Sequence, residues 1–150
     1  MSGVNVFEAE LQTDEGDPEG YNASYLRLAP LIGASKLGMT LYGLPPGQSI
    51  CPYHYEYGNE EWLLVLDGTP ALRDPGGERV LRSGDLVCFP SGPEGAHAVR
   101  GPGRIVIFST GERPSISVYP DSDKVGVRAV EDEEALNFRR GDAVDYWEGE

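Results

Sequence analysis

The chain has 150 residues, with 12 Lys and Arg against 25 Asp and Glu and a formal net charge of −13 at pH 7. This length suits one domain with one hydrophobic core, so we expect a single domain over 1–150. The acidic balance would repel phosphate backbones and anionic headgroups, which argues against nucleic acid and membranes as partners. No apolar stretch approaches the roughly 18 residues of a membrane span, and the N-terminus lacks the pattern of a secretory signal. We therefore expect a cytoplasmic protein.

The chain contains two cysteines, Cys51 and Cys88. Two are too few for the disulfide framework of a small secreted protein, so we expect both to be reduced thiols. Cys88 stands between Val87 and Phe89, and this setting predicts a small hydrophobic residue of the core.

The amino-acid composition of the chain changes near residue 37. Residues 1–30 are polar, acidic and rich in glycine, which predicts an N-terminal arm. From about 37 to 110, short β-prone runs alternate with turn residues such as Gly58-Asn59 and Asp67-Gly68. Regular spacing of this kind predicts an all-β sandwich or barrel with its core in that segment.

The remaining residues, 120–150, are expected to form a C-terminal tail. Only the stretch VEDEEALNF, residues 130–138, has helical character. The end of the tail mixes charged residues with Tyr146 and Trp147. Aromatic side chains of this kind are expected to dock the tail on the outer surface of the domain.

The segment CPYHYEYGNEEWLLVLDG, residues 51–68, carries the strongest chemical signal. Alternate side chains of a strand share a face, so His54 and Glu56 are expected to point the same way. Cys51 has the parity of the tyrosines rather than that of His54, so we do not expect it to be a ligand. The tyrosines between these positions are expected to point outwards: Tyr53, Tyr55 and Tyr57.

Glu61 and His97 extend this candidate site. Glu61 follows the Gly58-Asn59 turn, so a hairpin would bring it beside His54 and Glu56. His97 is the only other histidine in the chain, and it also follows a run of turn residues. On the residues alone, each histidine could be an ordinary partly buried ring, and the acidic and histidine side chains could fit a loose pattern by chance.

The residues of this region resemble the cupin superfamily of double-stranded β-helix barrels. Its first motif places a glycine before two histidines, followed by a glutamate and a glycine, and its second places a glycine and Pro-x-Gly before a histidine. The corresponding positions here are Gly47, His54, Glu56, Glu61 and Gly68, then Gly84, Pro90, Gly92 and His97. The resemblance implies a jelly-roll-like all-β barrel with short terminal arms, most similar to small single-domain bacterial cupins of unassigned activity.

The sequence departs from the family pattern at several points. The spacing before His54 is one residue longer than in the motif, the spacing before His97 is two residues longer, and Gly101 replaces a final asparagine. The largest change is Glu56 in the place of the second histidine. Glu56 could bind a metal directly, orient a histidine ring, or mark a site that has lost its metal. We expect direct binding.

The resemblance makes four residues the candidate metal ligands: His54, Glu56, Glu61 and His97. Glu60 is the alternate ligand or a proton shuttle. Two imidazoles with one or two carboxylates suit a divalent Zn, Mn, Fe or Ni ion. The resemblance implies that such a protein binds a small organic ligand in its barrel, with a metal-dependent oxygenase, isomerase or lyase activity as the first interpretation. The alternative is a non-catalytic binding module for a sugar or organic acid, with a vestigial or absent metal site, because the fold serves both roles.

The outward tyrosines predict the oligomeric state. Three tyrosines on the outside of a barrel would form a large exposed apolar stripe on a monomer. Members of the resembled family commonly pair through outer sheets or exchanged terminal segments. We therefore expect a homodimer.

Overall fold

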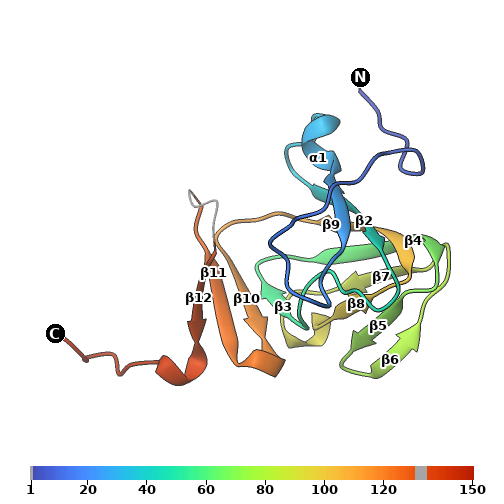
Figure 1. The fold of residues 1–150 in the computed structure, drawn as a ribbon. Coiled ribbons are helices and arrows are strands. Elements are labelled where there is room, and N and C mark those ends of the chain that lie inside the picture. The colour runs from blue at the N-terminus through green and yellow to red at the C-terminus, as the bar shows by residue number, and fades with distance from the viewer. Residues whose placement is uncertain (1, 131–134) are drawn as a thin grey trace.

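A computed structural model describes residues 2–130 and 135–150 of the chain. Within these residues, antiparallel strands form three sheets that curve into a barrel, as the sequence predicts (Figure 1). None of the helices in this described part is long and apolar enough to cross a membrane. That the whole of 1–150 is one domain stays a prediction.

The largest sheet has five strands in the order β1-β2-β9-β4-β7. These strands are β1 (Ser24–Arg27), β2 (Gly38–Leu44), β9 (Gly103–Ser109), β4 (Glu61–Gly68) and β7 (Leu86–Phe89). A helical turn, α1 (Leu28–Leu31), links the first two strands. The sheet therefore combines segments that lie far apart in the sequence, which is expected for a jelly-roll barrel.

Two smaller sheets complete the barrel. The four-stranded sheet has the order β12-β11-β10-β3, and the three-stranded sheet has the order β6-β5-β8. The first comprises β12 (Leu136–Arg139), β11 (Lys124–Arg128), β10 (Ser115–Tyr119) and β3 (Tyr55–Tyr57). The second comprises β6 (Gly77–Val80), β5 (Ala71–Asp74) and β8 (Ala98–Arg100). Three short 3-10 turns follow strands: η1 (Pro93–Gly95), η2 (Pro120–Ser122) and η3 (Arg140–Asp142).

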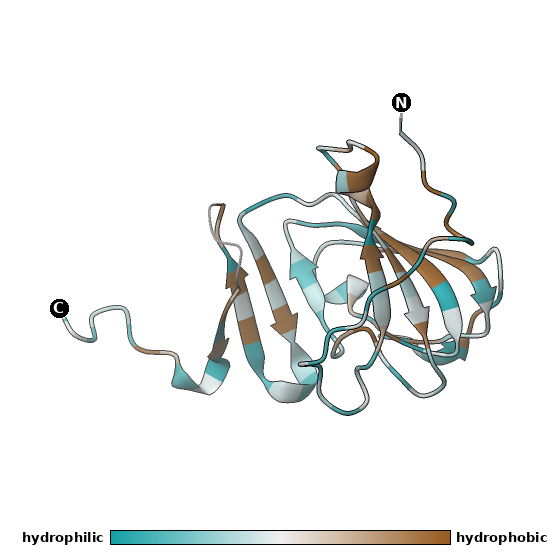
Figure 2. Cartoon of the chain, turned by 45° about the horizontal axis from the view of Figure 1, so that its top comes forward, coloured by the Kyte–Doolittle hydropathy of each residue, from teal (hydrophilic) through white to brown (hydrophobic). Residues whose placement is uncertain are grey.

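The hydrophobic core lies inside the barrel, against the five-stranded sheet. Leu63 and Val65 alternate along β4 and are almost fully buried, as is Ile105 on β9. They pack with Leu72 and Val99 from the three-stranded sheet. Figure 2 shows that the hydrophobic segments concentrate on the strands of the barrel, whereas its loops and the projecting C-terminal tail are mainly polar.

The N-terminal arm packs on the outer face of the five-stranded sheet. Val6 and Leu11 lie against a second buried cluster that contains Leu41. Arg104 fastens the arm, because its guanidinium donates hydrogen bonds of 2.8 Å to the carbonyl oxygens of Val6 and Ala9. The arm is more ordered than its composition predicts, because its last residues form β1 and the start of α1.

The C-terminal expectations are wrong in two respects. Residues Leu136–Arg139 form β12 and pair with β11, so this part of the stretch expected to be helical is a strand. Residues 131–134 of that stretch lie outside the described residues. Tyr146 and Trp147 are 84% and 71% exposed and contact each other, so they do not dock the tail on the barrel (Figure 1).

The prediction for Cys88 is also wrong. Cys88 is exposed, while its neighbour Phe89 on β7 is buried. The strand alternates its side chains between the two faces of the sheet, so adjacent residues cannot both enter the core. An apolar run alone did not reveal which of them points inwards.

Candidate metal centre

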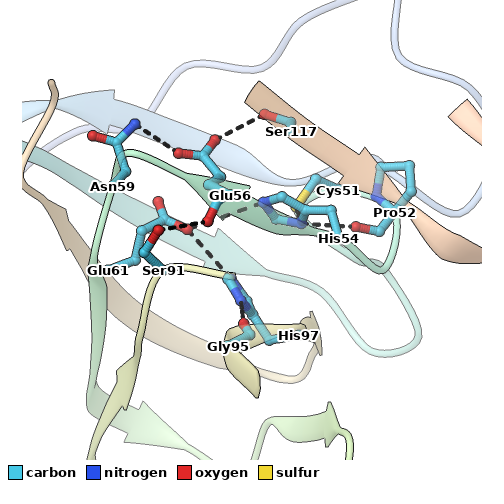
Figure 3. A network of polar contacts seen from close by, with 10 residues as sticks. All are labelled: Cys51, Pro52, His54, Glu56, Asn59, Glu61, Ser91, Gly95, His97 and Ser117. Atoms are coloured by element: carbon cyan, nitrogen blue, oxygen red, sulfur yellow. Dashed lines mark hydrogen bonds and ion pairs between the residues drawn. The ribbon is translucent and has the colours of Figure 1, made fainter. Parts of the chain in front are cut away.

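Three side chains converge inside the barrel: His54, Glu61 and His97. One ligand atom from each lies within 4.8 Å of the other two. Glu61 Oε2 is 3.5 Å from His97 Nε2 and 4.0 Å from His54 Nε2 (Figure 3). Glu61 is the first residue of β4. His97 comes from a later part of the sequence than His54 and Glu61. The cluster could hold a metal ion.

The backbone brings the two histidines together. His54 and His97 pair as an isolated antiparallel bridge, in which the amide of each donates to the carbonyl of the other at 3.1 and 2.8 Å. The turn before His97 needs a glycine, because a Cβ atom on Gly95 would collide with the carbonyl oxygen of Pro90. This close approach lets the carbonyl of Gly95 reach the ring of His97.

Hydrogen bonds set the orientation of both rings. His54 Nδ1 is 3.0 Å from the carbonyl oxygen of Pro52, and His97 Nδ1 is 2.9 Å from that of Gly95. A carbonyl oxygen can only accept, so each Nδ1 carries the proton and, in the neutral ring, each Nε2 presents a lone pair towards Glu61. Histidines that bind metals are typically held in this way.

The electrostatic environment keeps these rings neutral. Burial, followed by the proximity of His54, lowers the pKa of His97 to about 4. Burial also lowers the pKa of His54. Burial, followed by the charge of Glu56, raises the pKa of Glu61 to about 7. Two lone pairs and a carboxylate that is costly to ionise thus face one another, and a cation among them would relieve that cost.

Aromatic rings pack against the histidines. Phe89 stacks on His97 with ring centroids 3.7 Å apart and an interplanar angle of 6°. Tyr119 stacks on His54 at 5.8 Å and 24°. These contacts limit the rotation of the imidazoles, so the Nε2 atoms stay directed at Glu61.

Glu56, the fourth expected ligand, lines the same cavity but is not part of the ligand group. Its Oε2 accepts a hydrogen bond of 2.8 Å from the Asn59 amide, and its Oε1 accepts one of 3.0 Å from the Ser117 hydroxyl (Figure 3). The structure therefore brings three of the four expected residues into one ligand group and engages the fourth with hydrogen-bond donors. Direct metal binding by Glu56 stays a prediction.

Asn59 is a part of the site that the sequence did not reveal. It is buried, and its Oδ1 accepts hydrogen bonds from the Glu112 amide at 2.7 Å and the Thr110 hydroxyl at 3.2 Å. Its NH2 group must therefore face Glu56. In the sequence Asn59 signals only a turn, and the donors to its Oδ1, Thr110 and Glu112, lie more than fifty positions away.

Of the remaining residues, the tyrosines of β3 lie as predicted, whereas Cys51 does not. Tyr55 and Tyr57 contact each other edge to face on the same side of β3, as parity predicts. Cys51, by contrast, lies 3.6 Å from His54 Nδ1, so its predicted placement is wrong. Parity fails there because residues 51–53 are not in a strand. Glu60, the alternate ligand, lies outside the ligand group, and its amide bonds to the Thr110 hydroxyl.

The cluster opens into a cavity of about 300 Å³, whose wall includes His54, Glu56, Glu61, His97 and Arg128. Burial raises the pKa of the thiol of Cys51 in this wall to about 12, so the thiol stays protonated at neutral pH. A larger hollow of about 790 Å³ lies between β12 and the tail and contains none of the candidate ligands. All four of the candidate metal ligands therefore line the smaller cavity.

The barrel and its imidazole–carboxylate cluster define a class of protein, and comparisons with known proteins agree with it. The cupin-domain family model matches residues 40–111. A sugar phosphate isomerase of the cupin superfamily from Silicibacter pomeroyi is 25% identical, with a TM-score of 0.79 and 94% of each chain covered. Residues 40–111 of the chain therefore form a cupin domain.

Two further solved structures share this fold. A candidate sugar phosphate isomerase from Acidithiobacillus ferrooxidans is 22% identical, with a TM-score of 0.78, covering 92% of this chain and 88% of that one. The polyketide cyclase RemF from Streptomyces resistomycificus is 23% identical, with a TM-score of 0.62, covering 89% and 88%. A search of curated proteins found no match to the sequence.

Proposed function

We propose that this cupin is a metal-dependent isomerase of a small hydroxycarbonyl compound, such as a sugar. The observation that carries the proposal is the presence, in one cavity, of three convergent ligand atoms and a separate, firmly held carboxylate. The likeness to the Silicibacter pomeroyi enzyme supports the reaction class. His54, Glu61 and His97 would hold a Zn, Mn, Fe or Ni ion.

The donor set fits such an ion. Both imidazoles are fixed through Nδ1, and their Nε2 atoms lie beside the Glu61 carboxylate. When bound, the ion supplies a Lewis acid that polarises a carbonyl oxygen. With three protein ligands, positions remain for the oxygens of a substrate. The role of this part of the chain is to bind and orient those oxygens.

Glu56 is the candidate base. Asn59 and Ser117 each occupy one lone pair of its carboxylate, and one lone pair remains on each oxygen. In the proposed reaction Glu56 removes a proton from the carbon beside the carbonyl and returns it to the former carbonyl carbon. A hydroxyl proton moves between the two oxygens, so the product is an isomer and no atom is gained or lost.

The test begins with the metal content of protein purified without chelator. We then expect sugar phosphates incubated in D2O to incorporate deuterium beside the carbonyl and to isomerise, as followed by NMR. Glu56→Gln should keep the metal and lower the rate by about 10²- to 10⁴-fold, the usual contribution of a positioned base. Glu60→Gln is the matched control, because Glu60 lies outside the ligand group and the cavity wall.

Two outcomes would contradict the isomerase. One is a metal-loaded protein that neither exchanges deuterium nor converts any of these sugars. The other is full activity in Glu56→Gln. Metal and ligand binding without turnover would instead favour the non-catalytic binding module.

We also propose that the chain is a homodimer that pairs through the outer face of the four-stranded sheet. A row of apolar residues crosses this face, because they are direct partners on successive strands: Tyr57, Ile116, Val127 and Leu136. Tyr57, Ile116 and Leu136 are 45%, 39% and 60% exposed. A second copy would cover the row across a twofold axis, since an isologous interface needs a self-complementary patch.

Sedimentation at micromolar concentration should give twice the 16.3 kDa of one chain, and a monomer would contradict the pairing.

A further inference from the structure

We propose that Arg128 forms an anion-binding end of the cavity, which takes the phosphoryl group of a phosphorylated sugar. The identity of the sugar portion rests on the proposed isomerase function, but the anion site rests on the placement of Arg128 alone.

The register points Arg128 into the barrel. Residues directly opposite in an antiparallel pair share a face, and Arg128 is opposite Ser115. Ser115 shares its side of β10 with Ser117, whose hydroxyl reaches Glu56. Lys124, two positions further along that face of β11 from Gly126, lies over the ring of Tyr119, which stacks on His54. The inner face of the sheet therefore carries Arg128 on the same side as the site.

Arg128 stands where two hollows meet. The cavity that holds the histidines and a second cavity of about 250 Å³ share three residues of their walls: Glu56, Glu61 and Arg128. The second cavity is polar, and its wall adds Asn59, Ser109, Glu112, Arg113 and Ser115. A ligand bound at the histidine cluster can therefore extend past Glu56 into this polar end.

Charged side chains of both signs line the two cavities. Glu56 and Glu61 line both, and Glu112 adds a third carboxylate to the polar one. Arg128 also lines both cavities, and Arg113 adds a second guanidinium to the polar one. Arg128 is therefore the guanidinium that an anionic group would meet on passing from the histidine cluster into the polar end. A guanidinium also matches the geometry of a phosphoryl group, which it can bind through two hydrogen bonds.

The experiment compares ligands that differ in one group. Calorimetry would measure the affinity of the protein, both as metal-loaded and as metal-free forms, for sugar phosphates, for the same sugars without phosphate and for the corresponding sugar acids. We expect wild type to prefer the phosphates. Arg128→Gln should weaken phosphate binding by about 10- to 100-fold and leave the neutral sugars unchanged, because it removes a charge-assisted contact. Arg128→Lys should restore part of the loss.

Arg82→Gln is the matched control, because it removes the same charge from a side chain that is 88% exposed and outside both cavities. Unchanged phosphate affinity in Arg128→Gln, or an equal loss in Arg82→Gln, would overturn the inference. Equal affinity of wild type for sugar acids would overturn the phosphoryl assignment.

Metal titration and deuterium exchange test the proposed isomerase function independently of the anion site. A protein without metal whose phosphate preference still depends on Arg128 would contradict the isomerase and uphold the anion site.

Discussion

The five-stranded and four-stranded sheets of this barrel differ in the polarity of their faces. The five-stranded sheet has an apolar inner face that carries Leu63 and an apolar outer face, around Leu41, that the N-terminal arm covers. The four-stranded sheet has a polar inner face that carries Ser117 and Arg128, and an apolar outer face that carries Ile116. Alternate side chains of a strand point to opposite faces, so a sheet can be apolar on both faces or polar on one.

The two sheets therefore contribute differently to stability and to the site, although Glu61 at the start of β4 belongs to both the five-stranded sheet and the ligand group. Apolar side chains of the first sheet fill the interior, so that sheet forms the core. Polar side chains of the second sheet leave a cavity, which Glu56 enters from β3. The uncovered apolar row on its outer side then needs another surface. We expect substitutions in the two sheets to have different kinds of effect.

The largest expected effect is on stability, from the five-stranded sheet. Leu63 is fully buried on β4, and Leu63→Ala should cost about 2–5 kcal/mol in the free energy of unfolding. Denaturant unfolding would measure this cost. Ser117→Ala, on the inner face of the other sheet, is the matched control and should cost about 1 kcal/mol, the value of one hydrogen bond. Equal costs would contradict the division between the sheets.

The second prediction concerns pH and the metal-free protein. The pKa of Glu61 rises on folding from its ordinary 4.5 to about 7, so the folded state binds this proton more tightly. The associated stability is fully present below about pH 4.5 and is lost as the pH rises through about 7, a loss of about 3 kcal/mol. Glu61→Gln cannot suffer this loss. Relative to wild type, metal-free Glu61→Gln should therefore gain stability between pH 5 and 8.

Denaturant unfolding at the two pH values, with chelator present, would check this gain. His97 acts in the opposite direction in both proteins, because its lowered pKa of about 4 costs stability as the pH falls through 6.5. Comparing the variant with wild type at each pH cancels this contribution. A difference that does not change with pH would show that Glu61 is not forced to ionise in the cavity.

The third prediction separates the two carboxylates of the site. Removing a ligand, as in His97→Ala, should weaken Mn(II) or Zn(II) binding by more than about 100-fold, beyond the usual cost of losing a supporting hydrogen bond. Glu56→Gln should weaken it by less than about tenfold, because Glu56 is outside the ligand group and its oxygens accept hydrogen bonds from Asn59 and Ser117. Calorimetric titration of metal-free proteins would measure both. A loss in Glu56→Gln as large as in His97→Ala would restore Glu56 as a ligand.

The smallest expected effect on folding comes from the outer face of the four-stranded sheet. Leu136 is 60% exposed, so Leu136→Ser should change the unfolding free energy of one chain by about 0.5 kcal/mol or less. The same change should raise the dissociation constant of the proposed dimer by about 10- to 100-fold, since it removes a buried leucine. Sedimentation over a range of concentrations would measure it. Val80→Ser, on the edge strand β6 and 69% exposed, is the control.

The spacing of the two motifs in the sequence predicted much of the candidate site. The β-rich segment, the cupin resemblance, and the grouping of His54, Glu61 and His97 all follow from residues that stand in or beside short strands. Local alternation also placed the outward tyrosines of β3 correctly. These features depend on near neighbours and on two motifs, so the sequence carries them directly.

The sequence determined the all-β character and the three convergent side chains, because strand propensity, turn residues and motif spacing are local properties. Only the tertiary structure decided the partners of Glu56, the inward position of Cys51, the outward position of Cys88 and the strand at Leu136–Arg139. Each depends on contacts between distant segments. The hydrogen bonds that hold Asn59 come from residues after β9, and β12 exists because it pairs with β11. Long-range pairing of this kind leaves no local pattern, so a residue's role in it can be read only from the folded chain.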